Sequence, residues 1–289
     1  MVGILGIVNV TRDSFSDGGQ FLRPAAAIAH AEQLLADGAT VVDVGAESTH
    51  PDAEDVTAAE EIARLEPVVA ALLRRGAEVS VDTTKPDVMA AMAARGVAWL
   101  NDVAGFRSAA AVAAAARSTA RLCVMFARND RPRAARTAAG AGDVVAEAGA
   151  FFADRIAALE AAGVARSRIV LDPGMGFFLG REAAPSLEML RRLPELRRFG
   201  LPLLVSVSRK SFLGELTGRG ASERGAATLA AELFAAQQGV DWIRTHDVRA
   251  LRDALLVWQQ CAPGRPATPQ RAPRTQPRPG EAIDRGAVQ

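Results

Sequence analysis

Polar residues stand at or just after the ends of short apolar runs along most of this chain. A single aspartate in such a place usually caps a turn or a helix, but here the pattern recurs about eight times. Independent caps do not explain that recurrence well. The residues are Asn9, Asp43, Asp82, Asn101, Asp172, Ser208, Lys210, Arg244 and His246, with the apolar Met125 as the exception at the fifth run.

These side chains fall into two chemical groups. One group accepts hydrogen bonds and suits a flat ligand whose edge carries several N–H donors, such as an amino-pyrimidinone. The other group donates and suits a phosphate or diphosphate, with a histidine that can bond an oxyanion. The acceptors are Asp82, Asn101 and Asp172. The donors are Asn9, Lys210, Arg244 and His246.

Eight β-like runs alternate with helical patterns, which predicts parallel βα units that close into a single-domain (β/α)8 TIM barrel over residues 1–261. The carboxyl ends of all barrel strands meet on one face, so the polar residues would converge on one pocket. An open doubly wound sheet is the alternative, but no G-x-G-x-x-G follows the first run. The runs are 2–10, 40–45, 78–83, 98–103, 121–126, 168–174, 202–208 and 241–246.

Local signals predict where several helices begin. Thr57 and Glu60 form a possible capping box, and Pro86 can open the next helix. Asp143 and Ser222 are candidate caps of two later helices. Alternation along the run 202–208 would point Ser208 and Lys210 to the same side.

Composition narrows the class of protein. The chain has 289 residues, a hydrophobic fraction of 49% and a formal net charge of +1, which favours neither nucleic acid nor a membrane as partner. Only Cys123 and Cys261 are present, as expected in a reducing cytoplasm. Residues 262–289 are rich in Pro, Arg and Gly and predict a disordered tail.

Two loops extend the predicted pocket. The segment "NVTRDSFSDGG" after the first run holds Phe15 and Asp17, and its composition suits a mobile lid over a metal–phosphate complex. The segment "ESTHPDAED" after the second run carries Thr49, His50 and Pro51. His30 falls in a helical pattern and is expected at the surface.

Seven motifs occur in order along almost the whole barrel region and together resemble the dihydropteroate synthase family. They are "GIVNVTRDSFSDGG", "DVGAEST", "SVDT", "LNDVAGF", "LDPGMGF", "SVSRKSF" and "IRTHDV". The resemblance implies a (β/α)8 barrel that joins 6-hydroxymethyl-7,8-dihydropterin diphosphate to p-aminobenzoate and releases pyrophosphate with Mg²⁺. It also implies a homodimer.

The resemblance also implies roles for individual residues. The pterin would be bound by Asp82, Asn101, Met125, Asp172 and Lys210. The diphosphate would be bound by Asn9, His50, Arg244 and His246, with Asn9 also meeting Mg²⁺. The p-aminobenzoate site would be lined by Thr49, Pro51, Phe177, Phe178, Lys210 and Ser211. The residues expected to take part in catalysis are Asp17, Asp82, Lys210 and His246.

Departures from the usual family pattern point to one subgroup. His50 replaces an arginine, "MFA" at 125–127 replaces "MHM", and Phe178 follows Phe177. These features are similar to the Sul-type, sulfonamide-resistant synthases and predict reduced sulfonamide sensitivity, with Phe178 and His50 as the suspected residues. The alternatives are a non-catalytic pterin-binding homologue and a corrinoid-type pterin methyltransferase.

Overall fold

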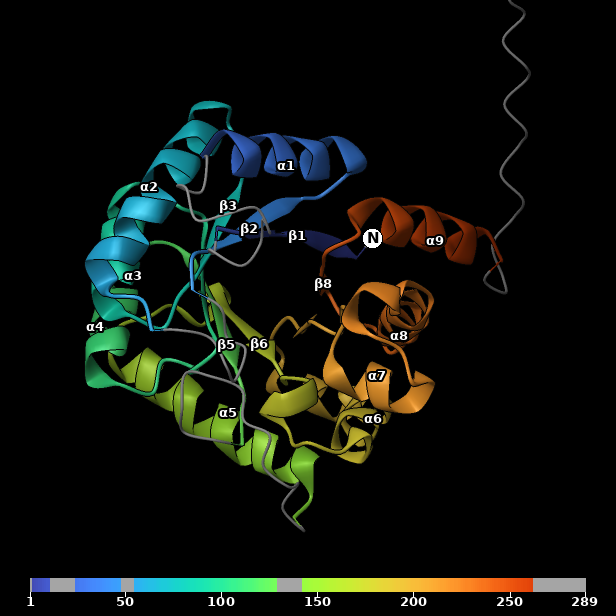
Figure 1. The fold of residues 1–289 in the computed structure, drawn as a ribbon. Helices are drawn as coiled ribbons and strands as arrows, with labels where there is room; N and C mark the ends of the chain where they lie inside the picture. Colours follow the sequence, from blue (N-terminus) through green and yellow to red (C-terminus); the bar gives the residue numbers. More distant parts are fainter. Residues whose placement is uncertain (1, 11–23, 48–54, 129–141, 262–289) are drawn as a thin grey trace, which may run out of the picture.

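The computed structural model describes residues 2–10, 24–47, 55–128 and 142–261. Its strands form one parallel eight-stranded sheet in the order β6-β5-β4-β3-β2-β1-β8-β7, and α-helices alternate with the strands (Figure 1). A bridge between Leu171 and Leu203 joins the two ends of this sheet, and the Leu171 N–H donates to the Pro202 carbonyl at 2.9 Å. The predicted (β/α)8 barrel is confirmed.

The eight strands match the eight predicted runs within a few residues at each end. Their bounds are β1 (Gly3–Asn9), β2 (Val41–Gly45), β3 (Val79–Asp82), β4 (Trp99–Asp102), β5 (Arg121–Met125), β6 (Ile169–Asp172), β7 (Leu204–Val205) and β8 (Trp242–Thr245). The helices of the described residues are α1 (Pro24–Asp37), α2 (Ala58–Arg74), α3 (Pro86–Ala94), α4 (Ala109–Arg117), α5 (Val144–Ala161), α6 (Ala183–Arg191), α7 (Ser211–Thr217), α8 (Gly225–Gln237) and α9 (Val248–Cys261).

Three of the four predicted helix starts are confirmed. Thr57 caps α2 in a complete capping box with Glu60, and Pro86 is the first residue of α3. The Asp143 carboxylate accepts the N–H groups of residues 145 and 146 at the start of α5. The prediction for Ser222 is wrong, because that residue lies in a 3₁₀ turn and Arg224 occupies the position before α8.

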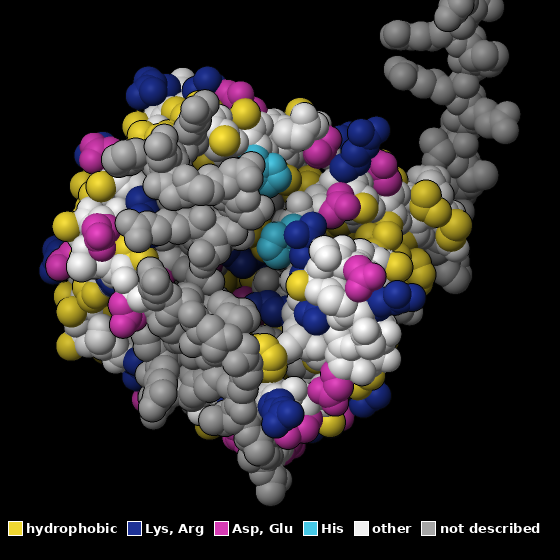
Figure 2. Space-filling model, viewed as in Figure 1, with side chains coloured by type: hydrophobic (Ala, Val, Ile, Leu, Met, Phe, Trp, Pro, Cys, Tyr) yellow, Lys and Arg dark blue, Asp and Glu magenta, His cyan; other side chains and the backbone are white. Residues whose placement is uncertain are grey.

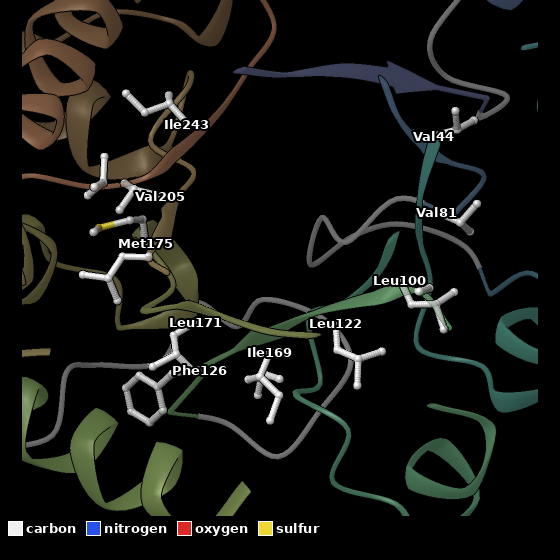
Figure 3. Close-up of a cluster of buried hydrophobic side chains, with 14 of the residues drawn as sticks. Val44, Val81, Leu100, Leu122, Phe126, Ile169, Leu171, Met175, Val205 and Ile243 are labelled. Atoms are coloured by element: carbon white, nitrogen blue, oxygen red, sulfur yellow. The ribbon is translucent and has the colours of Figure 1, made fainter. Parts of the chain in front are cut away.

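Apolar residues fill both sides of the barrel wall. Outward-facing strand residues such as Val44, Leu122 and Ile243 belong to the large core between strands and helices (Figure 3). A second cluster contains Leu5, Val41, Trp99, Cys123, Val170 and Leu204. Trp99 and Trp242 pack edge to face in this second cluster, with ring centroids 4.9 Å apart. Because an apolar layer fills this part of the barrel, the polar strand-end residues are confined to the opposite end.

β7 is much shorter than predicted. The expected strand over 202–208 is reduced to Leu204–Val205, and Arg209 has a left-handed φ of 58°. The alternation argument for Ser208 and Lys210 is therefore wrong, because the chain has left extended geometry before it reaches Lys210. A turn, rather than a strand, sets the direction of that lysine.

The described residues bear on two further expectations, the lack of a membrane-spanning helix and the exposure of His30, but not on the predicted tail. No helix among them is long and apolar enough to cross a membrane. His30 is exposed on α1, as predicted. The predicted tail, residues 262–289, lies outside the described residues.

A partly buried ion pair supports the wall beside β2 and β3. The Lys85 ammonium donates to Glu61 Oε2 at 2.8 Å and also to Glu47. Glu61 is completely buried on α2, while Glu47 follows β2 and accepts the Val56 N–H at 3.3 Å. Lys85 thus joins the end of β2, helix α2 and the start of α3.

We expect Lys85→Met to lower the free energy of unfolding by about 3 kcal/mol, because it leaves the carboxylate of Glu61 buried without this cation. Arg95→Met is the matched control. It breaks an exposed pair with Glu66 and is expected to cost less than about 1 kcal/mol. Chemical denaturation measures both changes, and equal losses in the two variants would contradict the argument.

Candidate active site

The strand-end residues converge at one end of the barrel, as the sequence predicted. Arg244 of β8 reaches across to carboxylates on β2 and β3, and the charges of Asp82 and Asp172 act on Lys210. The space-filling view shows a hollow on this face with Lys or Arg side chains inside it and histidine at its rim (Figure 2). The hollow therefore combines fixed positive charge with buried carboxylates.

Arg244 is the centre of a charged network. Its Nη2 donates to Asp82 Oδ2 at 2.9 Å, and its Nε donates to Asp43 Oδ2. Asn101 Nδ2 donates to the same Asp43 oxygen at 3.3 Å. Asp43 is fully buried, and because its Oδ2 accepts from both groups it orients both the guanidinium and the amide.

Two buried acceptors in this network have no partner among the described residues. They are Asn101 Oδ1 and Asp43 Oδ1. Buried polar atoms in native proteins are nearly always hydrogen-bonded. Because Asn101 uses its amide N–H₂ on Asp43, its carbonyl oxygen is available for an N–H donor. We take this orphaned acceptor as a mark of a ligand site.

Loss of water controls the ionisation of the central groups. Desolvation raises the pKa of Asp82 to about 7, against the charge of Arg244 and with the help of Asp43. Desolvation likewise raises the pKa of Asp172 to about 6. For Lys210, desolvation and then Arg244 lower the pKa to about 8. These three groups can therefore change charge near neutral pH, which is typical of functional sites.

Lys210 sits at a tightly packed turn. Its ammonium lies 5.0 Å from the centre of the Phe178 ring, a cation–π distance. The turn at Gly176, whose φ is +65°, packs against residues 210 and 211, and a Cβ on Gly176 would come within 2.9 Å of Ser211 Oγ. Glycine is needed there both for the left-handed conformation and for the close approach.

Phe178 itself is buried. It exposes 3% of its surface and clusters with Val103, Met125 and Ala127, whereas Phe177 is half-buried. Asp172 Oδ1 accepts the Gly174 N–H at 2.8 Å, which fixes the start of the same turn. The strand-five Met125 and the β6–α6 turn therefore meet below Lys210.

His246 lies at the end of β8 beside β7. Its Nδ1 is 2.9 Å from Ser208 Oγ. Desolvation lowers the pKa of His246 to about 3, and the charges of Arg209, Arg244 and Lys210 act in the same direction. The imidazole is therefore neutral at physiological pH and can offer a single N–H.

Several predicted site residues are not covered by this geometry. Asp17, Thr49, His50, Pro51 and the loop residue Phe15 lie outside the described residues. Asn9 is described at the exposed end of β1. Among the described residues, no group of three or more His, Cys, Asp or Glu side chains is placed to hold a metal ion.

Sequence reasoning gave Asp43 no role, although it named the residue as a strand-end polar group. The structure places it at the base of the Arg244 network. A signal was available, since "VVDVG" puts a carboxylate in the middle of an otherwise apolar strand. A charged residue at such a position is rarely buried unless it is paired. Arg244, in the eighth predicted strand of the same barrel, was a candidate partner.

Comparisons with known proteins agree with this architecture. Residues 5–246 match a family described as pterin binding enzyme. The chain is 55% identical over 255 residues to dihydropteroate synthase type-2 of Escherichia coli. The match covers 88% of this chain and 94% of that protein. Two similar solved structures are dihydropteroate synthases of Xanthomonas albilineans. The one with 4-aminobenzoic acid has a TM-score of 0.83 and 42% identity, covering 91% and 94% of the two chains. The one with 7,8-dihydropteroate has a TM-score of 0.79 and 40% identity, covering 91% and 95%.

We expect Asp43→Asn to lower the pKa of Asp82 below about 7. The substitution removes a nearby negative charge and leaves Arg244 free to pair more fully with Asp82. Titration of the carboxyl carbons by ¹³C NMR, assigned with Asp82→Asn, measures the shift.

Ser80→Ala is the matched control, because Ser80 pairs in register with Asp43 on β3 and is buried but neutral. It should leave the titration of Asp82 in place. An unchanged or higher pKa of Asp82 in Asp43→Asn would contradict the proposed role of Asp43.

Proposed function

The chain belongs to the pterin-binding enzymes and, within them, to the dihydropteroate synthase family, and on this premise we propose how its site works in folate synthesis. The reaction joins 6-hydroxymethyl-7,8-dihydropterin diphosphate to p-aminobenzoate, giving 7,8-dihydropteroate and pyrophosphate. The observation that carries the proposal is the Arg244 network, which sets a cationic group beside buried acceptors.

The hydrogen-bond acceptors Asn101 and Asp172 suit the pterin ring. Asn101 Oδ1 is a buried acceptor with no partner among the described residues. Asp172 uses Oδ1 for the Gly174 N–H, which leaves its other oxygen for the ligand. The edge of a pterin carries an amino group and a ring N–H, and such an edge pairs well with carboxylate and amide oxygens. Met125, buried beside Phe178, supplies an apolar contact.

The hydrogen-bond donors Arg244, His246 and Lys210 suit the diphosphate. Arg244 is always charged and is already oriented by Asp43 and Asp82, so binding costs little reorganisation. Neutral His246 adds one N–H donor, and Lys210 adds a positive charge on the pterin side. As the C–O bond to the diphosphate breaks, negative charge moves onto the leaving group, and these fixed donors stabilise it.

Departure of the diphosphate leaves positive charge on the methylene carbon of the pterin. We place Asp82 beside that carbon, where its carboxylate stabilises the cation. The amino nitrogen of p-aminobenzoate then forms the C–N bond and loses a proton to solvent. An arylamine is a weak base but a competent nucleophile, so the site needs to position it more than to activate it.

The predicted Mg²⁺ fits the described residues as a companion of the diphosphate. Asn9 offers one hard oxygen at the exposed end of β1, and Mg²⁺ commonly binds through one or two protein oxygens together with substrate phosphates and water. We propose that Asn9 holds the ion in this way. When bound, Mg²⁺ neutralises part of the charge on the diphosphate.

We also propose that the enzyme has reduced sulfonamide sensitivity. The buried Phe178 cannot offer much surface to a ligand, but it supports Lys210 from below. Its neighbour Phe177 is half-buried. A site that is tightly shaped around the carboxylate end of p-aminobenzoate can exclude a longer sulfonamide while keeping its substrate.

We also propose that the protein forms a homodimer and is located in the cytoplasm. Large apolar side chains are exposed on three consecutive helices, α7, α8 and α9, and such surfaces often mark contacts between proteins. They are Leu216, Phe234, Leu256, Val257 and Trp258. Light scattering should give twice the chain mass of 30.3 kDa, and the monomer mass would contradict the dimer. Cys123 and Cys261 are both unpaired thiols, which supports a reducing compartment.

We expect purified protein to release pyrophosphate only when both the dihydropterin diphosphate and p-aminobenzoate are present, and to lose activity when EDTA removes Mg²⁺.

The value of kcat/KM for the pterin substrate should be bell-shaped in pH. Asp172 and Asp82 have raised pKa values of about 6 and 7, so their charged forms are lost as the pH falls through this range. Lys210 has a lowered pKa of about 8, so its charge is lost as the pH rises through that value.

Two variants separate the enzyme's groups from those of the substrate. Asp82→Asn should abolish the contribution of Asp82 to the acidic limb, while a limb that persists belongs to Asp172 or to the diphosphate. Lys210→Arg should move the alkaline limb upward, because a guanidinium keeps its proton. Pterin binding without pyrophosphate release would instead identify a non-catalytic homologue.

For drug tolerance, we expect the inhibition constant of sulfamethoxazole to exceed the KM of p-aminobenzoate by at least about tenfold. Phe178→Leu should reduce this ratio because Lys210 loses its aromatic support. Phe152→Leu, at a buried phenylalanine of α5, controls for loss of packing alone. Inhibition of the unmodified enzyme at concentrations near the KM would reject the proposal.

A further inference from the structure

The turn before helix α7 has a backbone shape that needs support. Arg209 has a left-handed φ of 58°, which residues other than glycine adopt at a cost because their Cβ comes close to a carbonyl oxygen. The turn lies beyond β7, which ends at Val205. It leads directly into Lys210 and Ser211, two residues expected at the substrate sites, so its shape sets the direction of both side chains.

The guanidinium of Arg224, just before α8, holds this turn by its carbonyl groups. Its Nη1 donates to the Arg209 carbonyl at 2.9 Å and to the Lys210 carbonyl at 3.3 Å, and its Nε donates to the Arg219 carbonyl at 3.0 Å. Thr228 Oγ1, one helical turn further along, accepts the Arg209 N–H at 3.0 Å. Both backbone polar groups of the left-handed residue are therefore bound by side chains from the region where α8 begins.

Arg224 uses its charge on the backbone of this turn. Among the described residues, its side-chain hydrogen bonds all go to main-chain carbonyl oxygens, and the side chain is half-buried. Hydrogen bonds from a charged donor are stronger than those between neutral groups. The rigid fork of a guanidinium also serves several acceptors at once, which the single ammonium of a lysine does less well.

A glycine in α7 leaves the space through which Arg224 reaches the turn. Glycine in a helix interior is less favourable than alanine, yet Gly214 lies in the middle of Ser211–Thr217 and does not have a positive φ. A Cβ at this position would come within 2.2 Å of Arg224 Nη2 and 2.5 Å of its Cζ. Because the guanidinium is the movable end of a long side chain, an added methyl group would push it off the carbonyls that it holds.

We propose that Arg224 is a positioning residue for the synthase reaction and that Gly214 provides the space that it needs. The guanidinium holds the turn at residues 209–210, and the turn keeps the Lys210 ammonium inside the site, 5.0 Å from the centre of the Phe178 ring. The inference rests on the proposed function for one point only, that Lys210 takes part in binding the substrates.

Lys210 itself reports the state of the turn, because the chain has only two lysines, Lys85 and Lys210. Desolvation and then the charge of Arg244 lower the pKa of Lys210 to about 8, against the opposing charges of Asp172 and Asp82. A loosened turn lets the ammonium reach water, so its pKa should rise toward the ordinary lysine value of about 10.4. Titration of the lysine ¹³Cε resonances, assigned with Lys210→Arg, measures this pKa in the ligand-free protein.

Two substitutions disturb the same contact from opposite sides. Arg224→Met removes the guanidinium, and Gly214→Ala displaces it while improving helix propensity. Each should raise the pKa of Lys210 above about 9 and lower kcat/KM for the pterin diphosphate about tenfold at pH 7, while Lys85 titrates as before. An unchanged pKa of Lys210 in either variant would overturn the proposal. If Arg224→Met does not fold, Gly214→Ala alone decides.

Gly225→Ala is the matched control for the glycine substitution. Gly225 is the first residue of α8 and directly follows Arg224, yet an added Cβ there meets nothing within 4 Å. This substitution should leave the pKa of Lys210 at about 8. A rise equal to that in Gly214→Ala would indicate general loosening of the segment and overturn the assignment.

Arg168→Met is the matched control for the loss of an arginine. Arg168 also donates to main-chain carbonyls, those of Ala120 at 2.8 Å and Ala115 at 3.0 Å, but it precedes β6 at the opposite end of the barrel. It should leave the pKa of Lys210 in place, and a rise would likewise overturn the assignment. Because the titration needs no substrate, a lack of synthase activity would contradict the proposed function, whereas the pKa of Lys210 tests this inference separately.

Discussion

The site depends on one guanidinium held between two carboxylates. Arg244 of β8 donates to Asp43 of β2 and to Asp82 of β3. The three charges come from strands that are far apart in sequence, and the barrel supplies the closure that brings them together. Burying such charges is costly unless each is paired. The network therefore constrains the ends of these strands to one arrangement, and it leaves the cation ready for an anionic ligand.

The same burial places the neighbouring groups near their points of ionisation. Asp82, Asp172 and Lys210 all lose water, and their pKa values move toward neutrality, to about 7, 6 and 8. Asn101 Oδ1 also has no hydrogen-bond partner among the described residues. Binding of a ligand with N–H donors and negative charge would complete the hydrogen bonds and offset the buried charges. The free energy gained by completing these hydrogen bonds thus contributes to the affinity for a molecule whose donors and charge are arranged to match the site.

Sequence reasoning could predict the features that repeated patterns determine. The eight strands and the convergence of Asp82, Asn101, Asp172 and Arg244 result from apolar runs ending in polar residues. It could not predict the short β7, because a turn made possible by the left-handed Arg209 replaces the end of an apolar run. It gave no role to Asp43, since pairing across the barrel is set by side-chain reach rather than by spacing along the chain. Ser222 failed as a cap because a 3₁₀ turn precedes α8.

The support of this site extends beyond the residues that face the ligand. The turn before Lys210 lies beyond β7 and is held by hydrogen bonds near the start of α8. Thr228 of α8 accepts the Arg209 N–H, and Arg224, just before α8, donates to the Arg209 carbonyl at 2.9 Å. The start of one outer helix thus holds the backbone of the turn from which the Lys210 side chain extends. Large apolar side chains are exposed on α7, α8 and α9, so a contact between copies on that surface would involve the same helix that holds this turn.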